Sequence, residues 1–305
     1  MKCMEKRGLV RADIKQDYVP GSIQIRTMTE EELKADKESI RCRIQLLQFV
    51  RHIQYCKAEL MPNCIVGTLF IPNKKEILSD RIGIGYYMDG MQLVLIGEEP
   101  VLAGLWELLQ KHELRVDGTT ADVLADFLDL LIEGEVPFLQ GLEQQLSVIE
   151  ERLLTRVPKN FYQTVIHYRK RLLVLHTYYE QLINMADMLA ANHNEILSEA
   201  ECQRFITFGA RAERLHDHVE MLREYVLQIR EMYQTQIDIS QNHAMNLLTV
   251  VTSLFLPPSL LVGWYGMNFA NMPELQWKYG YMALILLCVL ILVTEIRWFK
   301  KKGLL

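Results

Sequence analysis

The sequence lacks the cysteine patterns of disulfide-stapled and zinc-binding proteins. It contains 6 cysteines in 305 residues, and none of them forms a CxxC pair or a regular spacing. Secreted disulfide scaffolds and zinc ribbons depend on such patterns. We therefore expect the cysteines to be reduced, as in a reducing compartment.

A secretory signal and an excess of basic residues are also lacking. The first residues, MKCMEKRGLV, contain no apolar core, so we expect the first 240 residues to stay in the cytoplasm. The net charge is −5, which argues against nucleic acid as a partner.

Common motifs of enzymatic catalysis are absent as well. The sequence has no Walker lysine loop, no HExxH and no GxSxG. No candidate catalytic centre remains. We predict that the chain is not an enzyme and that it needs no cofactor.

The N-terminal residues 1–118 have the pattern of a cytoplasmic α/β domain. Short segments of alternating or β-branched residues occur at 22–28, 56–60, 64–71, 81–88 and 91–96. Residues 29–32 form a capping box for a helix expected to reach about Arg51, and a second helix is expected over 100–111. The Asp89-Gly90 pair predicts a hairpin. We expect a sheet that is at least partly antiparallel.

From Thr119 onward the apolar spacing is helical. It predicts three long blocks, at 119–155, 159–195 and 198–265. We assign 119–244 to a cytoplasmic helical stalk. A seam with alternating intervals of four and three residues predicts lengthwise packing against other helices. Its members are Leu215, Val219, Leu222, Val226, Ile229 and Tyr233.

Two segments near the C-terminus are apolar enough to cross a bilayer. Residues 245–265 carry no charge, and at about 1.5 Å per residue they reach across the ~30 Å hydrocarbon layer. Residues 279–299 form the second span, the loop 266–278 lies between them, and the tail 300–305 is basic. The positive-inside rule then places both termini in the cytoplasm. We predict a multi-pass protein of the inner or plasma membrane, in contact with lipid.

Polar and apolar residues recur at steps of three or four along the first span. The stripe runs through Asn242, Met245, Leu248 or Thr249, Thr252, Leu256, Ser259 and Gly263. A channel lining needs such a stripe on one helix face. Because two helices cannot enclose a pore, this hypothesis requires a ring of subunits. Alternatively, the Thr and Ser residues only pack transmembrane helices together.

Charged residues are nearly absent at membrane depth. Their absence from the first span argues against a proton relay or a charge-binding transporter. Glu295 lies near the cytoplasmic end of the second span, where its side chain can reach the interface, and we interpret it as structural. The Pro257-Pro258 pair predicts a bend in the first span.

The outer loop carries the sequences YGMNF at 265–269 and MPEL at 272–275, between the two terminal spans and ahead of the basic tail. In these features the chain resembles the CorA family of magnesium transport proteins. The resemblance implies a funnel-shaped homopentamer, with cytoplasmic α/β domains, a helical stalk and a central pore lined by the first span. Asn268 would then form a ring of amides at the outer mouth. Amide oxygens suit Mg²⁺, which is octahedral and gives up its water reluctantly.

The resemblance also implies roles for other positions. In the loop, Gly266 would allow a close backbone turn and Met267 would hold the loop, which also carries Glu274. Along the pore it implies a polar ring at Asn242, apolar constrictions at Met245, Leu248 and Leu256, and wider polar positions at Ser259 and Gly263. The membrane potential would drive Mg²⁺ inward.

The resemblance also implies regulation by cytoplasmic Mg²⁺, but the residues at the expected positions support this role less well. In this family the ion closes the pore by binding acidic side chains between neighbouring subunits. Glu231 falls where the stalk acid is expected, but Asn63 stands where its acidic partner is expected. Asn246, Pro258 and Met282 are further departures from the common pattern.

Two alternatives to a Mg²⁺ importer, which would also pass Co²⁺ and Ni²⁺, stay open. One is a transporter of zinc or another transition metal from the same superfamily. The other is a membrane-anchored scaffold or sensor that does not conduct ions.

Two clusters of possible metal ligands are not assigned to a site. His216 and His218 are two residues apart, so on a helix they do not share a face and do not chelate one ion. An acidic stripe does share one face: Asp122, Asp126, Asp129 and Glu133. We interpret it as solvated, with a role in concentrating cations as the alternative.

Overall fold

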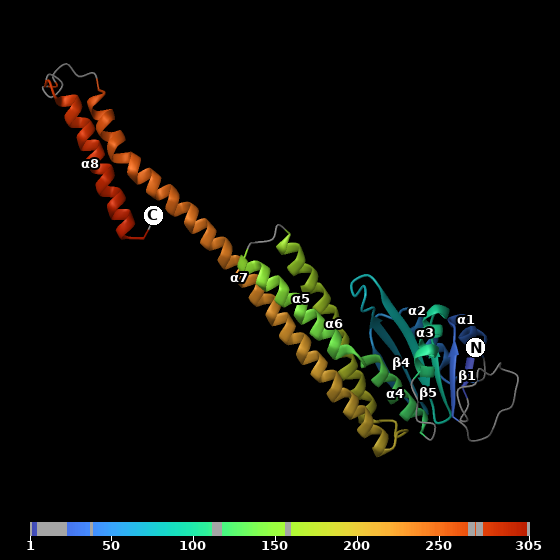
Figure 1. Cartoon of the computed structure of the whole chain (residues 1–305). Helices are drawn as coiled ribbons and strands as arrows, with labels where there is room; N and C mark the ends of the chain where they lie inside the picture. Colours follow the sequence, from blue (N-terminus) through green and yellow to red (C-terminus); the bar gives the residue numbers. More distant parts are fainter. Residues whose placement is uncertain are drawn as a thin grey trace. The chain divides into compact units, whose positions relative to one another are not determined.

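In a computed structural model of the chain, the N-terminal segments of alternating and β-branched residues form a six-stranded sheet of order β1-β2-β6-β5-β4-β3 (Figure 1). The strands are β1 (Lys2–Met4), β2 (Gln24–Met28), β3 (Lys57–Met61), β4 (Cys64–Pro72), β5 (Arg81–Met88) and β6 (Gln92–Ile96). The structure describes residues 2–4, 23–36, 39–111, 118–155, 160–267, 272 and 277–303. The chain divides into two units, Met1–Ile229 and Arg230–Leu305, which we describe separately.

The sheet is partly antiparallel, as predicted. All neighbouring strands are antiparallel except β2 and β6, which are parallel. The predicted Asp89-Gly90 hairpin joins β5 to β6, and the Asp89 carboxylate accepts hydrogen bonds from the backbone N–H groups of Met91 (2.8 Å) and Gln92 (2.9 Å). This Asx-type bonding fixes the turn. Strand β1 was not predicted from the sequence.

The single helix predicted after residue 29 is wrong. The capping box is present at Thr29 and Glu32, but the helix it opens, α1 (Glu30–Ala35), ends after six residues. Asp36 is extended, and its carboxylate accepts a 3.0 Å hydrogen bond from the Ser39 N–H. A second helix, α2 (Arg43–Arg51), follows. The helix predicted over 100–111 is confirmed as α3 (Glu99–Lys111).

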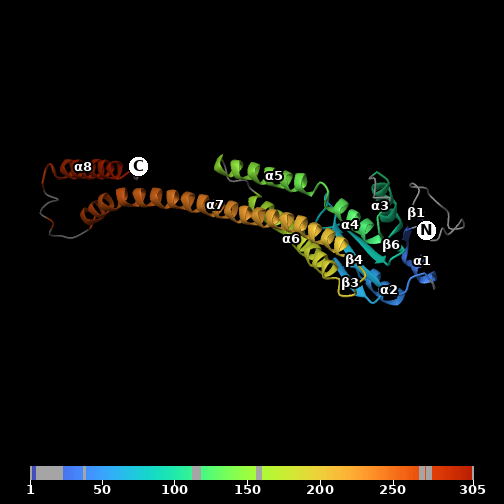
Figure 2. The same ribbon diagram turned by 90° about the horizontal axis from the view of Figure 1, so that it is seen from below.

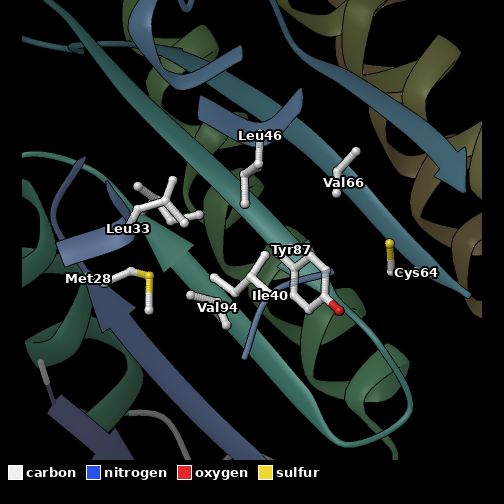
Figure 3. Packing of buried hydrophobic residues seen from close by; sticks show 9 residues of the cluster. Met28, Leu33, Ile40, Leu46, Cys64, Val66, Tyr87 and Val94 are labelled. Atoms are coloured by element: carbon white, nitrogen blue, oxygen red, sulfur yellow. The ribbon is translucent and has the colours of Figure 1, made fainter. Parts of the chain in front are cut away.

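The helices α1 and α2 cover one face of the sheet. Their side chains pack with strand residues in one cluster (Figure 3). The cluster consists of Met28, Leu33, Ile40, Leu46, Cys64, Val66, Tyr87, Val94 and Ile96. Neighbouring strand residues such as Ile65 and Tyr86 point to the opposite face and are also fully buried. The central strands are therefore covered on both sides.

The helical half of the first unit contains one more helix than predicted. The block 119–155 is divided into α4 (Thr120–Ile132) and α5 (Glu135–Thr155), so its prediction as one helix is wrong. Gly134 between them has a φ of +74°, which glycine adopts easily and which ends a right-handed helix. Helix α6 (Phe161–Ala191) ends at Asn192, which is in the left-handed conformation.

The long third block is confirmed as α7 (Glu199–Tyr265). In the first unit α7 lies beside α5 and α6 (Figure 2). The predicted seam is buried through Leu215, Val219, Leu222, Val226 and Ile229, and Tyr233 is half-buried. The seam therefore closes the core of the helical half.

The second unit contains the rest of α7 and α8 (Gly280–Lys301). Both helices are long and apolar enough to cross a membrane, and their apolar windows are almost fully exposed. Helix α7 continues through Pro257 and Pro258, and the predicted bend there stays a prediction.

We expect Gly67→Ala to destabilise the first unit by about 3 kcal/mol. A Cβ at Gly67 in β4 would lie 2.2 Å from the Lys57 carbonyl oxygen and 2.3 Å from the Tyr86 ring. Thermal unfolding of the full chain in detergent measures the effect.

Gly104→Ala is the matched control. Gly104 is exposed inside α3, and within the described chain an added Cβ meets no atom within 4 Å. The free energy of unfolding of this variant should rise by up to about 1 kcal/mol, because alanine has a higher helix propensity than glycine. An equal response of the two variants would contradict the close approach at Gly67.

Candidate functional site

The candidate site is a continuous stripe on the membrane part of α7. Every member of the stripe is exposed: Asn242, Met245, Leu248, Thr252, Leu256, Ser259 and Gly263. In the second unit α8 runs beside the last part of α7 (Figures 1 and 2). The shielded positions of this part of α7 lie on a different face, at Val250, Ser253, Leu254, Pro257, Pro258, Leu261 and Tyr265.

The two faces are opposite each other. Leu248 and Thr252 are each two residues from buried Val250, and Ser259 is two residues from shielded Pro257 and Leu261. At 3.6 residues per turn, a step of two residues is about 200° round the helix. The stripe therefore points away from α8 and is left uncovered by its own chain.

The two threonine hydroxyls of this segment are satisfied within the helix. Thr252 Oγ1 donates a 2.7 Å hydrogen bond to the Leu248 carbonyl, and Thr249 Oγ1 donates a 2.9 Å bond to the Met245 carbonyl. Donation fixes the hydroxyl proton toward the backbone, so each oxygen presents only lone pairs outward. The stripe offers neutral acceptors between apolar side chains, without any charge over 245–265.

The outer end of α7 turns tightly at the motif glycine. The Gly266 N–H donates to the Val262 carbonyl at 2.9 Å, and a Cβ at Gly266 would lie 3.0 Å from that oxygen. The Met267 N–H donates to the Trp264 carbonyl at 3.4 Å. Glycine thus fits this close turn. Asn268 and Glu274 lie outside the described residues.

The two candidate regulatory residues belong to different units. Glu231 is exposed on α7, and Asn63 is exposed in the turn between β3 and β4. Among the described residues, no group of three or more His, Cys, Asp and Glu side chains could hold a metal ion within one chain.

Three members of the acidic stripe, all on α4, are paired with α7, so the interpretation of a solvated stripe is wrong for Asp122, Asp126 and Asp129, whereas Glu133 is exposed. Arg204 bridges Asp122 (2.6 Å) and Asp126, and Arg211 contacts Asp129 at 2.6 Å. Burial raises the pKa of Asp129, whereas for Asp122 the hydrogen bonds from Thr119 and Arg204 outweigh burial and lower its pKa. These carboxylates hold two helices together.

Sequence inspection missed both arginines. Arg204 and Arg211 are seven residues apart on α7, as Asp122 and Asp129 are on α4. The signal available in the sequence was this equal spacing of seven residues, or two helical turns, in the arginines and in the aspartates. Residues seven apart lie on one face of a helix, so the two pairs can face each other. The partner helices, however, are far apart in the sequence.

The prediction that His216 and His218 do not share a face is confirmed. His216 Nε2 lies 3.1 Å from Nε2 of His176 on α6, whereas His218 Nε2 lies 3.6 Å from the Glu143 carboxylate on α5. Burial, together with Arg223 and the second imidazole, lowers the pKa of His176. The histidines connect α7 to two different helices.

Comparison with known proteins identifies the family. A family model described as CorA-like Mg²⁺ transporter protein matches residues 51–301. The chain belongs to this family. Membership confirms the recognition from the outer-loop motif, and it confirms that the chain is not an enzyme. With its two apolar C-terminal helices, the chain is a membrane protein of the CorA family.

Individual relatives cover the chain to different extents. The Cobalt/magnesium transport protein CorA of Thermotoga maritima is 27% identical over 180 residues, which are 59% of this chain. The chain spans about half of that relative, 51% of its length. The Magnesium transport protein CorA of Salmonella typhimurium is 26% identical over 233 residues, 70% of this chain and 69% of the relative.

A solved structure confirms the predicted fold class. The complete structure of the CorA magnesium transporter from Methanocaldococcus jannaschii aligns with a TM-score of 0.81 at 19% identity. The alignment covers 100% of this chain and 99% of that one. The α/β domain, the long helices and the two C-terminal membrane helices therefore follow one fold throughout.

We expect Arg204→Gln to lower the free energy of unfolding by about 1–2 kcal/mol, because two partly buried carboxylates lose their shared guanidinium. The side chains of Arg204 and Asp122 are 21% and 20% exposed, so solvent screens part of the loss. Thermal unfolding of the full chain in detergent measures it. Arg214→Gln, at an exposed arginine of the same helix, is the control and should change little. Equal losses would mean that the pairing with α4 contributes nothing specific.

Proposed function

We propose that the chain is one subunit of a homopentameric, channel-like importer of Mg²⁺ that also passes Co²⁺ and Ni²⁺. The observation that carries the proposal is the uncharged stripe on α7, exposed on the side opposite α8. Family membership supports it, as do the names of relatives called cobalt/magnesium and magnesium transport proteins. Both termini lie in the cytoplasm of a cell-membrane protein.

The stripe requires more than one chain. Two membrane-spanning helices cannot enclose a pore. Hydroxyl groups that face lipid find no hydrogen-bonding partner in it. A ring of identical subunits places the same face of α7 on a common axis. The number five comes from the resemblance to the family. In that ring α8 lies outside α7, toward the lipid.

The chemistry of the stripe suits a hydrated divalent ion. Mg²⁺ gives up its water reluctantly, so neutral oxygens that hold the water shell can pass it without stripping it. Asn268 supplies a ring of side-chain amides at the outer mouth, with Gly266 and Met267 shaping the turn and Glu274 in the same loop. The inside-negative potential supplies about 4.6 kcal/mol per 100 mV for a double charge.

Closure depends on apolar rings. Met245, Leu248 and Leu256 form constrictions that stop flow by dewetting, between the polar ring of Asn242 and the wider positions at Ser259 and Gly263, and Thr252 lines the pore between Leu248 and Leu256. Small rotations of α7 open and close them. Cytoplasmic Mg²⁺ stabilises the closed state through Glu231 of one subunit and the Asn63 turn of the next.

Asn268→Ala should reduce Mg²⁺ influx into proteoliposomes by about tenfold or more, since each subunit loses one contact to the hydrated ion. An imposed inside-negative potential drives the uptake. The matched control is Asn271→Ala in the same loop, which should transport like the unaltered protein. Size-exclusion chromatography verifies that both variants assemble.

Other outcomes of this assay separate the alternatives. Unchanged influx through an assembled Asn268→Ala oligomer would remove the selectivity role from that residue. Stronger competition by Zn²⁺ than by Co²⁺ would favour a transition-metal transporter. Absence of flux from the unaltered protein at every Mg²⁺ concentration would favour a non-conducting scaffold.

Glu231→Gln should raise the cytoplasmic-side Mg²⁺ concentration that halves the flux by at least about threefold, the scale of one exposed charge contact. The control is Glu213→Gln at another exposed glutamate of α7. An unshifted closing concentration in an active channel would place the sensing site elsewhere.

A further inference from the structure

Two cysteines that are separated in the sequence meet inside the first unit. Cys42 is the residue before α2, and Cys64 is the first residue of β4. Their Sγ atoms lie 3.1 Å apart. A disulfide would require the sulfur atoms to approach by about 1 Å more. Among the five cysteines whose side chains the structure describes, these two are the pair with contacting sulfur atoms.

The two thiols differ in their access to solvent. Cys64 is 1% exposed at the edge of the cluster drawn in Figure 3, whereas Cys42 is half-buried and packs against that cluster from outside. Burial, followed by the contact with Cys42, raises the pKa of the Cys64 thiol to about 12. A small oxidant can therefore reach Cys42, while Cys64 stays protonated behind it.

We propose that Cys42 and Cys64 form a peroxide-sensitive dithiol pair that closes to an intrachain disulfide. In the first step the Cys42 sulfur attacks one peroxide oxygen, the O–O bond breaks, water leaves and Cys42 becomes a sulfenic acid. In the second step the Cys64 sulfur attacks the Cys42 sulfur, the S–O bond breaks, and the hydroxyl leaves as water with the Cys64 proton. The two thiols supply the two electrons that reduce the peroxide. Thiol exchange with a small dithiol reverses the reaction.

The position of the pair gives the bond a definite place in the fold. Cys64 follows Asn63 directly, and Asn194 Nδ2 donates to the Met61 carbonyl at 2.8 Å and to the Cys64 carbonyl at 3.5 Å. The turn between β3 and β4 is thus already held by the connection between α6 and α7. A disulfide would also hold it to the start of α2.

In the test, the full-length protein in detergent is treated with hydrogen peroxide, and its remaining thiols are alkylated. The chain is then digested, and the peptides are analysed by mass spectrometry. We expect a linked Cys42–Cys64 peptide, lighter than the two free peptides by the mass of two hydrogen atoms. Dithiothreitol should remove the link. In Cys64→Ala, Cys42 should be trapped as a sulfenic acid by dimedone, and in Cys42→Ala, Cys64 should stay a thiol. Cys202→Ala, at a half-buried cysteine of α7, is the control and should keep the link.

Other results overturn the proposal. If the folded protein is exposed to peroxide and then unfolded, and both Cys42 and Cys64 are alkylated as free thiols, the pair is not reactive. If the linked peptides join two subunits, or join Cys42 to another cysteine, the intrachain bond is wrong. Because the main measurement uses the unaltered protein, poor folding of a variant does not affect it.

Discussion

The uncharged face of α7 that its own chain leaves exposed is the constraint on which the membrane half depends. In hydrocarbon each backbone polar group must be satisfied within the helix, and here the Thr249 and Thr252 hydroxyls also bond to carbonyls of the preceding turn. Apart from Pro257 and Pro258, which have no N–H to donate to the preceding turn, the helix supplies its own hydrogen bonds. What it lacks is a cover for the side opposite α8. In the proposed ring, identical chains round an axis would supply that cover and create a water-accessible path at the same time.

The N-terminal part of α7, in the first unit, is held by different interactions. In the first unit α7 is fixed by a buried apolar seam and by the pairing of Arg204 and Arg211 with three carboxylates of α4. Pairing removes most of the field of those carboxylates, so they are poor candidates for attracting cations. The negative charge that a divalent ion meets in the cytoplasm must therefore come from elsewhere, and exposed Glu231 is such a group.

Much of this fold was predictable because its signals are local and periodic. Alternating or β-branched residues predicted the strands from β2 to β6. An uninterrupted helical spacing of apolar residues predicted α7 as far as Tyr265. The predicted helices were wrong where a single residue changes the backbone direction, as at Gly134 and Asp36. A helical period is recognised over many residues, so it does not reveal one turn within the segment. The contacts of Arg204 and the meeting of Cys42 with Cys64 depend on tertiary packing, which no local pattern contains. Asn268, the central residue of the proposed selectivity site, was predicted by resemblance alone.

The absence of charge from the stripe has a consequence for the proposed transport. A ring of carboxylates would bind a divalent ion strongly in a low-dielectric pore, and conduction requires that the ion also leave. In the proposed pore, neutral amides and hydroxyls would hold the water shell weakly at each step, and the membrane potential would then give the direction of transport. Ion selection at the outer mouth and gating along α7 would be separable, because Leu248 and Leu256 would stop ions by excluding water and not by repelling charge. A polar replacement at one of those leucines should therefore alter closure more than ion preference.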